Sequence, residues 1–188
     1  MGKSALKKAI GPRYEGLRVS REEYLDLEDD GYLYDMMEGV LYLTPSGTFE
    51  HGTSYGEFFR VLGNFLKKNP LGRITLETDI LLPDGGDVLR PDLSFILNEN
   101  LNIVKKHIHG APDLICESLS DSTAERDLGE KANRYLACGV KEFWILDPRV
   151  QSIRVRYSRD GAWEEHSGNV LESRLLPGFR IDNREFWE

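Results

Sequence analysis

The chain has 188 residues, the size of one ordinary domain, and 40% of them are hydrophobic, which is enough to bury a core. Its 24 Lys and Arg residues against 32 Asp and Glu residues give a formal net charge of −8, which excludes a polycationic nucleic-acid binder but not an enzyme with a local basic patch. Two cysteines and no apolar run of about 18 residues exclude a disulfide framework and a membrane span, so we expect a cytoplasmic protein that does not contact membranes.

The N-terminal region predicts an arm followed by one folded domain. The first 13 residues carry four basic and no acidic side chains, so we expect a flexible basic arm over residues 1–14. No later composition shift marks a second boundary, and residues 15–188 are expected to form a single domain. Ser20 and Glu23 have the spacing of a capping box, which predicts a short helix directly after Ser20.

Hydrophobic periodicity predicts the elements that follow. Nine acids from Glu15 to Glu38 indicate a solvated face. The pattern of residues 39–44 predicts a strand. Apolar residues recur with i, i+3, i+4, i+7 spacing over residues 50–68, which predicts an amphipathic helix. Strands are expected over residues 73–82, 93–97, 114–119 and 141–146, and hairpin turns around residues 84–87 and 159–161.

A second long helix is predicted between the last two of these strands. Ser122 and Glu125 again have capping-box spacing, the helix should run to about Cys138, and Gly139 fits the position after its end. The order helix, strand, strand, strand, helix, strand predicts an α/β (α+β) fold. Its mixed sheet would be flanked by helices, with a right-handed helical crossover joining two parallel strands.

Polar residues at unexpected places in this pattern are candidate site residues. Glu117 interrupts the apolar run LICESL, where it either forms a salt bridge or lies at a sheet edge, or else acts in a site. Asp92 follows Pro91 at the start of a strand and either caps a turn or has a functional role; Asp113 also follows a proline, and only one of the two needs to be functional. Lys131 lies at the edge of an apolar helical stripe, so its ammonium either reaches water or points at Glu117.

Two carboxylates and a lysine on neighbouring elements suit the metal-assisted hydrolysis of a phosphodiester. Two carboxylates can hold one Mg²⁺ or Mn²⁺ and leave positions for water and a phosphate oxygen. A lysine can orient or deprotonate the attacking water, or offset the charge that develops on the phosphoryl group. Asp92, Glu117 and Lys131 are therefore our candidate catalytic residues.

Residues 90–148 contain the runs RPDLSFI and GAPDLICESLSDSTAERDLGEKANRYLACGVKEFWILDP, and LESRLLPGFRI follows near the C-terminus. These runs resemble the Uma-type restriction endonuclease family, which belongs to the PD-(D/E)XK nuclease superfamily. The resemblance covers roughly residues 15–185 and is most specific over residues 90–148. It implies a restriction-endonuclease-like core of order α-β-β-β-α-β, here with an extra N-terminal helix and strand and a C-terminal β-hairpin.

The resemblance also implies roles for individual residues. Asp92 and Glu117 take the places of the two motif acids and would hold the metal, with the backbone carbonyl of Ser118 as a third ligand. Leu119 stands where the motif lysine is expected, and Lys131 occupies the migrated position on the next helix. Possible accessory residues are Glu38, Glu50, His51 and Tyr135, with Glu57 as a weaker candidate. By their place in the sequence, Lys105 and Lys106 are either nucleic-acid contacts or solvated surface, and Arg126 either contacts substrate or caps the helix.

The resemblance and the residue pattern together predict a DNA endonuclease that depends on Mg²⁺ or Mn²⁺. The alternative is a catalytically inactive nuclease-fold protein that binds nucleic acid or a protein partner, because a fold does not fix a function. A homodimer is expected for an enzyme that cuts substrates with two-fold symmetry. The sequence leaves the recognition site, and the choice between DNA and RNA, open.

Overall fold

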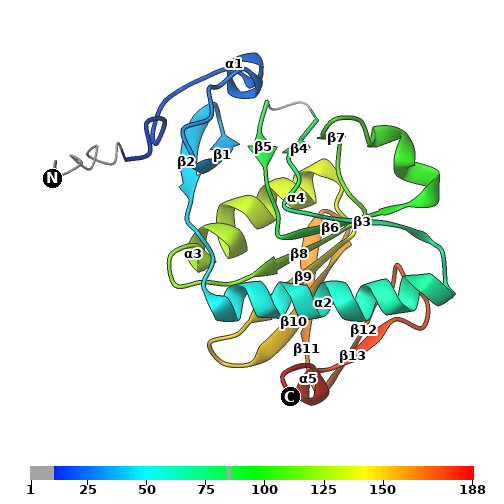
Figure 1. Ribbon diagram of the computed structural model, residues 1–188. Coiled ribbons are helices and arrows are strands. Elements are labelled where there is room, and N and C mark those ends of the chain that lie inside the picture. Colours follow the sequence, from blue (N-terminus) through cyan, green and yellow to red (C-terminus); the bar gives the residue numbers. More distant parts are fainter. Residues whose placement is uncertain (1–10, 84–85) are drawn as a thin grey trace, which may run out of the picture.

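The computed structural model describes residues 11–83 and 86–188 (Figure 1). Most of the expected basic arm, residues 1–10, and two residues of the expected turn at 84–87 lie outside the described residues. Of the arm, Arg13 is described: its N–H donates to Oδ2 of Asp30. The elements in chain order are α1 (Arg21–Leu25), β1 (Leu33–Met37), β2 (Val40–Thr44), α2 (Phe49–Lys68), β3 (Gly72–Leu76), β4 (Ile80–Leu81), β5 (Val88–Leu89), β6 (Leu93–Leu97), the 3-10 helix η1 (Asn98–Ile103), β7 (Ile108–His109), β8 (Leu114–Ser118), α3 (Ala124–Arg126), the π-helix η2 (Asp127–Lys131), α4 (Ala132–Cys138), β9 (Glu142–Asp147), β10 (Ser152–Arg159), β11 (Ala162–Ser167), β12 (Val170–Glu172), β13 (Arg180–Asp182) and α5 (Asn183–Phe186).

A mixed six-stranded sheet forms the centre of the molecule, with the strand order β11-β10-β9-β8-β6-β3. β8 and β9 are parallel, and the helical segment α3-η2-α4 crosses over between them; the other pairs in this sheet are antiparallel. This arrangement confirms the predicted fold class and the predicted order of the core elements. The hairpin of β10 and β11, which turns at residues 160–161, is confirmed as well.

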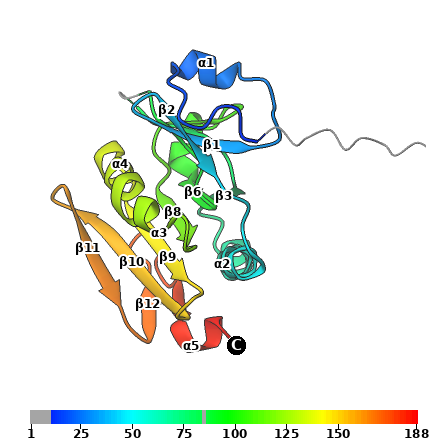
Figure 2. The same ribbon diagram turned by 90° about the vertical axis from the view of Figure 1, so that its left-hand side faces the viewer.

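Helices cover the two faces of this sheet (Figure 2). Phe58 and Leu62 of α2 pack in one core with Trp144, and the Phe58 and Trp144 ring centroids are 5.4 Å apart. Ala132 and Tyr135 of α4 pack in a second core on the opposite face. Successive residues of a strand point to opposite faces, so β8 sends its even-numbered side chains toward α2 and its odd-numbered ones toward α4. That alternation places Glu117 beneath the crossover helix.

A second sheet, of order β2-β1-β5-β4-β7, lies at one end of the central sheet (Figure 1). The single strand predicted over residues 73–82 is wrong, because Glu77 has a φ of 46° and the chain leaves the central sheet there. The first part, β3, pairs with β6, whereas β4 pairs with β5 in the second sheet. Strand β1, over residues 33–37, was not expected from the acidic region, yet four of its five residues are buried.

The crossover helix begins differently from the prediction. Thr123 is its N-cap and makes no side-chain capping hydrogen bond, so the predicted capping box from Ser122 to Glu125 is wrong. The C-terminal end of the crossover helix agrees with the prediction, because Gly139 follows Cys138 with a left-handed φ of 98°. The capping box of Ser20 and Glu23 on α1 is confirmed. In the described part of the chain, no helix is both long and apolar enough to cross a membrane.

A close approach of β3 to β6 requires glycine at residue 72. A Cβ placed there would overlap the carbonyl oxygen of Ile96 and would lie 2.6 Å from Cζ of Phe95. We expect Gly72→Ala to lower the free energy of unfolding by about 1–3 kcal/mol, as overpacking does, measured by urea unfolding. Gly63→Ala in α2 is the matched control: nothing lies within 4 Å of its added Cβ, and it should stabilise the helix by about 0.5–1 kcal/mol. Equal effects of the two changes would contradict this explanation.

Candidate active site

Two candidate acids meet at the start of β6 and the end of β8. Because β6 and β8 are neighbours, Asp92 lies beside Glu117 and Ser118. The N–H of Asp92 donates to Oε2 of Glu117 over 3.2 Å, and the N–H of Ser118 donates to Oδ2 of Asp92 over 2.7 Å. Each carboxylate thus accepts a backbone N–H from the segment that carries the other carboxylate, and these two hydrogen bonds fix their relative positions.

Lys131 reaches this pair from the crossover helix. Its Nζ lies 2.8 Å from Oε1 of Glu117 and 3.3 Å from Oδ1 of Asp127, and its side chain is only 4% exposed. Tyr135, one turn further along, donates its hydroxyl to the same Glu117 oxygen over 2.9 Å. The alternative in which the lysine ammonium reaches water is therefore wrong, and the predicted orientation toward Glu117 is confirmed.

Asp127 and Lys131 are the two ends of the π-helix η2 and lie on the same side of the crossover segment. A π-turn has a longer repeat than the 3.6 residues of an α-helix, so it rotates the following residues out of the expected phase. Both ends of η2, Asp127 and Lys131, are buried. Ordinary α-helical spacing predicts Lys131 only at the edge of the apolar stripe, whereas the structure buries it fully, at the end of a π-turn that shifts the helical phase.

A third acid, Asp35 of β1, completes the surroundings of Lys131, and the sequence reasoning missed it. Its side chain is fully buried, and its Oδ2 lies 3.6 Å from Nζ of Lys131 and 3.8 Å from Nη2 of Arg126. Its Oδ1 accepts the N–H of Arg90 over 2.8 Å, whereas Oδ2 has no hydrogen bond among the described residues. The signal was present, because Asp35 interrupts the apolar run LYDMM just as Glu117 interrupts LICES.

The burial of these charges changes their protonation. Burial raises the pKa of Glu117 to about 8, and the nearby Lys131 ammonium only partly opposes that rise. Burial acts to lower the pKa of Lys131, but Asp35, Glu117 and Asp127 outweigh it and raise that pKa well above its ordinary value. Lys131 is therefore an ammonium at neutral pH, held between three carboxyl groups.

The N-terminal part of α2 contributes histidine and serine, and no acid, to the site. Nε2 of His51 lies 3.3 Å from Oδ2 of Asp92, and this contact raises the pKa of His51 although burial opposes the rise. Ser54 shares a hydrogen bond of 2.5 Å with the hydroxyl of Ser118. His51 is thus brought to the site as predicted. Glu50 and Glu57, on the same helix, have no side-chain contact with Asp92, Glu117 or Lys131 among the described residues.

A cavity of about 760 Å³ opens over these groups. Asp92, Glu117, Lys131 and His51 line it together with Arg126. Two segments far apart in the sequence contribute to its lining. They are residues 43–48, at the end of β2 and before α2, and residues 120–123, before the crossover helix. The catalytic candidates therefore share one solvent-accessible hollow large enough for a nucleotide-sized group.

The remaining predicted residues divide between the cavity and the rest of the surface. Arg126 lines the cavity and donates to the carbonyl of Leu43 over 3.3 Å. Glu38 does not line it, since that side chain is 84% exposed in the β1–β2 turn and pairs with Arg134. Lys105 and Lys106 do not line it either. Asp113, of the second Pro-Asp pair, has a structural role, because it binds Lys141 and caps the N–H of Leu97.

Comparison with known proteins agrees with this geometry. The Uma2 family, described as "Putative restriction endonuclease", matches residues 21–184. The chain belongs to the Uma2 family. A crystal structure of a protein described as a putative nuclease, from Anabaena variabilis, is similar with a TM-score of 0.77 at 18% identity, and the match covers 90% of this chain and 97% of that one. At that identity the likeness shows the fold alone, and a comparison with curated proteins gives no match.

The carboxylates of this Uma2-family protein have oxygens that could bind a divalent cation. Among the described residues, no set of three or more His, Cys, Asp and Glu side chains is arranged to hold a metal by itself. Two oxygens are still available: Oδ1 of Asp92 has no partner within 11–83 and 86–188, and Oε2 of Glu117 accepts only the N–H of Asp92. Mg²⁺ is commonly held by one or two carboxylates, with water and substrate phosphate completing its coordination. The donor set of the Uma2-family site therefore fits Mg²⁺ or Mn²⁺, while the Ser118 carbonyl as a third ligand stays a prediction.

Proposed function

We propose that this protein is an endonuclease that hydrolyses phosphodiester bonds of DNA with the help of Mg²⁺ or Mn²⁺. The observation that carries the proposal is the convergence of Asp92, Glu117 and Lys131, from three separate elements, on one cavity. Membership of the Uma2 family supports the same conclusion. A cation held by Asp92 and Glu117 would polarise the scissile phosphate and stabilise the departing oxygen.

The protein's own groups suggest a division of labour. Because its pKa is raised, Lys131 does not accept a proton at neutral pH, so it orients the attacking water and offsets charge on the phosphoryl group. Asp35 and Asp127 position that ammonium. Arg126, which also lines the cavity, supplies a second fixed positive charge for a phosphate oxygen.

The predicted partners follow from the same site. The proposed homodimer would bring two such sites together, one for each strand of a duplex. DNA in the cytoplasm remains our proposed substrate. With a net charge of −8, the protein should bind nucleic acid weakly except at low salt.

Nicking of supercoiled plasmid by the purified protein tests the proposal. We expect nicking with Mg²⁺ and with Mn²⁺ and none in EDTA. We expect Asp92→Asn to reduce the rate about 100-fold or more, because it removes the charge of a metal ligand. Asp113→Asn is the matched control, since Asp113 is also a Pro-Asp acid at a strand start but lies outside the cavity.

The control separates chemistry from folding. Asp113→Asn should keep the wild-type rate per folded molecule, with the folded fraction measured by circular dichroism. No nicking by the wild type with either metal would favour the alternative of an inactive nuclease-fold protein that binds nucleic acid or a protein partner. Equal nicking by wild type and Asp92→Asn would contradict the assigned site.

A further inference from the structure

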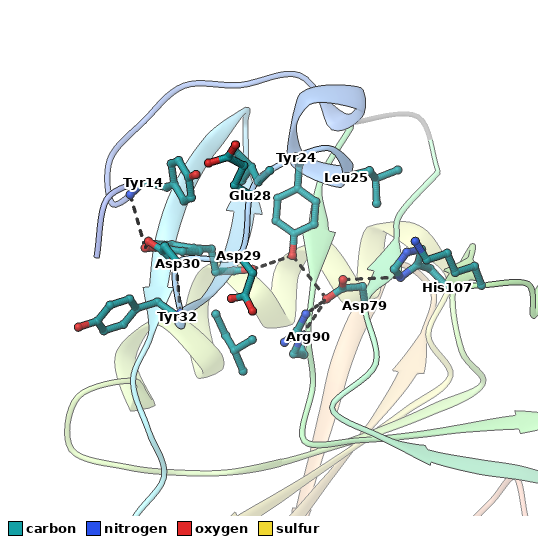
Figure 3. A pocket seen from close by; sticks show the side chains of 14 residues that line it. Tyr14, Tyr24, Leu25, Glu28, Asp29, Asp30, Tyr32, Asp79, Arg90 and His107 are labelled. Carbon is teal, nitrogen blue, oxygen red and sulfur yellow. Dashed lines mark hydrogen bonds and ion pairs between the residues drawn. The ribbon is translucent and has the colours of Figure 1, made fainter. Parts of the chain in front are cut away.

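A second hollow, of about 180 Å³, shares lining residues with the active-site cavity. Figure 3 shows the side chains that line it. We call it the tyrosine groove after four of its lining residues, Tyr14, Tyr24, Tyr32 and Tyr34. Figure 3 shows Tyr14 and Tyr32 at one end of the groove and His107 at the other. It is formed by the loop before β1, by α1 and by the start of the second sheet, none of which belongs to the nuclease core.

The tyrosine groove adjoins the active-site cavity. Tyr32, Leu33 and Arg90 line both hollows. Arg90 stands two residues before Asp92, and two residues of extended chain span about 7 Å. The groove and the cavity are therefore neighbours, joined along the chain by the short segment from Arg90 to Asp92.

The floor of the groove is rigidly built. Asp79 is only 8% exposed. Its Oδ1 accepts a hydrogen bond from Nε of Arg90 over 2.8 Å and lies 2.7 Å from Nη2 of the same guanidinium. The hydroxyl of Tyr24 donates to the carbonyl of Tyr34 over 3.0 Å and lies 3.5 Å from the same Asp79 oxygen. Packing and hydrogen bonds thus hold the Tyr24 ring in place before any ligand arrives.

The charges of the groove select against phosphate. Four of its lining residues are acids, Glu28, Asp29, Asp30 and Asp79, against two bases, Arg90 and Lys106, together with His107. Arg90 is already paired with Asp79, so the acids outnumber the bases that are left. Figure 3 shows the carboxylate of Asp29 directed into the groove. One Asp29 oxygen accepts the N–H of Gly31, and the other has no partner among the described residues, so it can accept from an amino group. Tyrosine rings and free carboxylate oxygens suit a neutral aromatic ring that carries an amino group.

We propose that the tyrosine groove holds an unpaired nucleobase, from the nucleotide next to the scissile phosphate. Aromatic rings stack on the face of any base, and carboxylates accept from the exocyclic amino groups of adenine and cytosine. A base inside a duplex cannot reach the groove, so it has to be unpaired or turned out of the stack. The inference rests on the proposed nuclease function and extends it: the preferred substrate has an unpaired base beside the cut.

Binding to defined duplexes tests this inference. Fluorescence anisotropy in EDTA and low salt would compare four labelled duplexes: fully paired, with one unpaired adenine, with one unpaired thymine, and with an abasic residue in that place. We expect the unpaired-adenine duplex to bind about tenfold more tightly than the abasic and paired duplexes, with thymine between them. Tyr32→Ala should abolish this preference, whereas Tyr32→Phe, which keeps the ring, should retain it. Asp29→Asn should make adenine and thymine equal.

A matched control removes an aromatic ring that is about as exposed as Tyr32 but lies outside the tyrosine groove. Phe59 on α2 is 42% exposed against 38% for Tyr32 and lines neither hollow, so Phe59→Ala should keep the preference. Equal binding of the adenine and abasic duplexes by the wild type, or no binding to any of them, overturns the inference, as does a preference that survives Tyr32→Ala. Plasmid nicking is scored separately, so metal-dependent nicking without a base preference would refute the groove and leave the nuclease proposal standing.

Discussion

Lys131→Met should lower the rate of plasmid nicking about 100- to 1,000-fold and the free energy of unfolding by about 3–5 kcal/mol. Methionine fills similar space but leaves Asp35, Glu117 and Asp127 facing one another without the ammonium that now lies 2.8–3.6 Å from each. Breaking a buried ion pair on one side is strongly destabilising because the remaining charge is uncompensated. Urea unfolding followed by tryptophan fluorescence, and nicking rates per folded molecule, measure the two effects.

A double variant separates the two roles of Lys131. Asp35→Asn removes one of the buried carboxylates that face Lys131 and keeps Oδ1, which accepts the N–H of Arg90. Added to Lys131→Met, it should restore part of the lost stability, because fewer like charges are buried together. It should not restore nicking, since no ammonium returns to the cavity. Recovery of both stability and nicking would mean that Lys131 serves the fold alone.

Much of the fold could be predicted from local sequence patterns. The long apolar period of α2, the fully buried run of β8 and the left-handed Gly139 are each determined by neighbours in the chain. The break at Glu77, which sends β3 and β4 to different sheets, has no such local signal. It depends on which strands are available for pairing, and that is a property of the whole fold.

The candidate site was predicted only in part, because some of its residues have a local sequence signal and others depend on the whole fold. Asp92, Glu117 and Lys131 each depart from the pattern of their own segment, and their meeting follows from the topology of the core. Asp35 was overlooked because eight other acids surround it in the sequence, and only pairing in the second sheet buries it. The burial of Lys131 is also a tertiary effect, because its partners Asp35 and Glu117 lie on other elements and only Asp127 is close in the sequence.

Glu117→Gln should change how the stability of the metal-free protein depends on pH. The pKa of this buried carboxyl is about 8 in the fold against 4.5 for the ordinary group, so the folded state binds its proton more tightly. Its contribution to stability is therefore complete below about pH 4.5 and is lost as the pH rises through about 8. Relative to the glutamine variant, the wild type should lose on the order of a few kcal/mol between pH 5 and pH 8.

Urea unfolding in EDTA at several pH values measures this difference. Glutamine can direct its amide NH2 at the N–H of Asp92, which would cost stability. That loss of stability is the same at every pH, so only the slope of unfolding free energy against pH reports on the protonation of residue 117. Saturating Mg²⁺ should flatten the wild-type slope, because a bound cation favours the ionised carboxyl, and should leave the variant almost unchanged. Parallel pH profiles for the two proteins in EDTA would show that Glu117 stays ionised in the fold. An unchanged wild-type slope with Mg²⁺ would remove Glu117 from the proposed metal ligands.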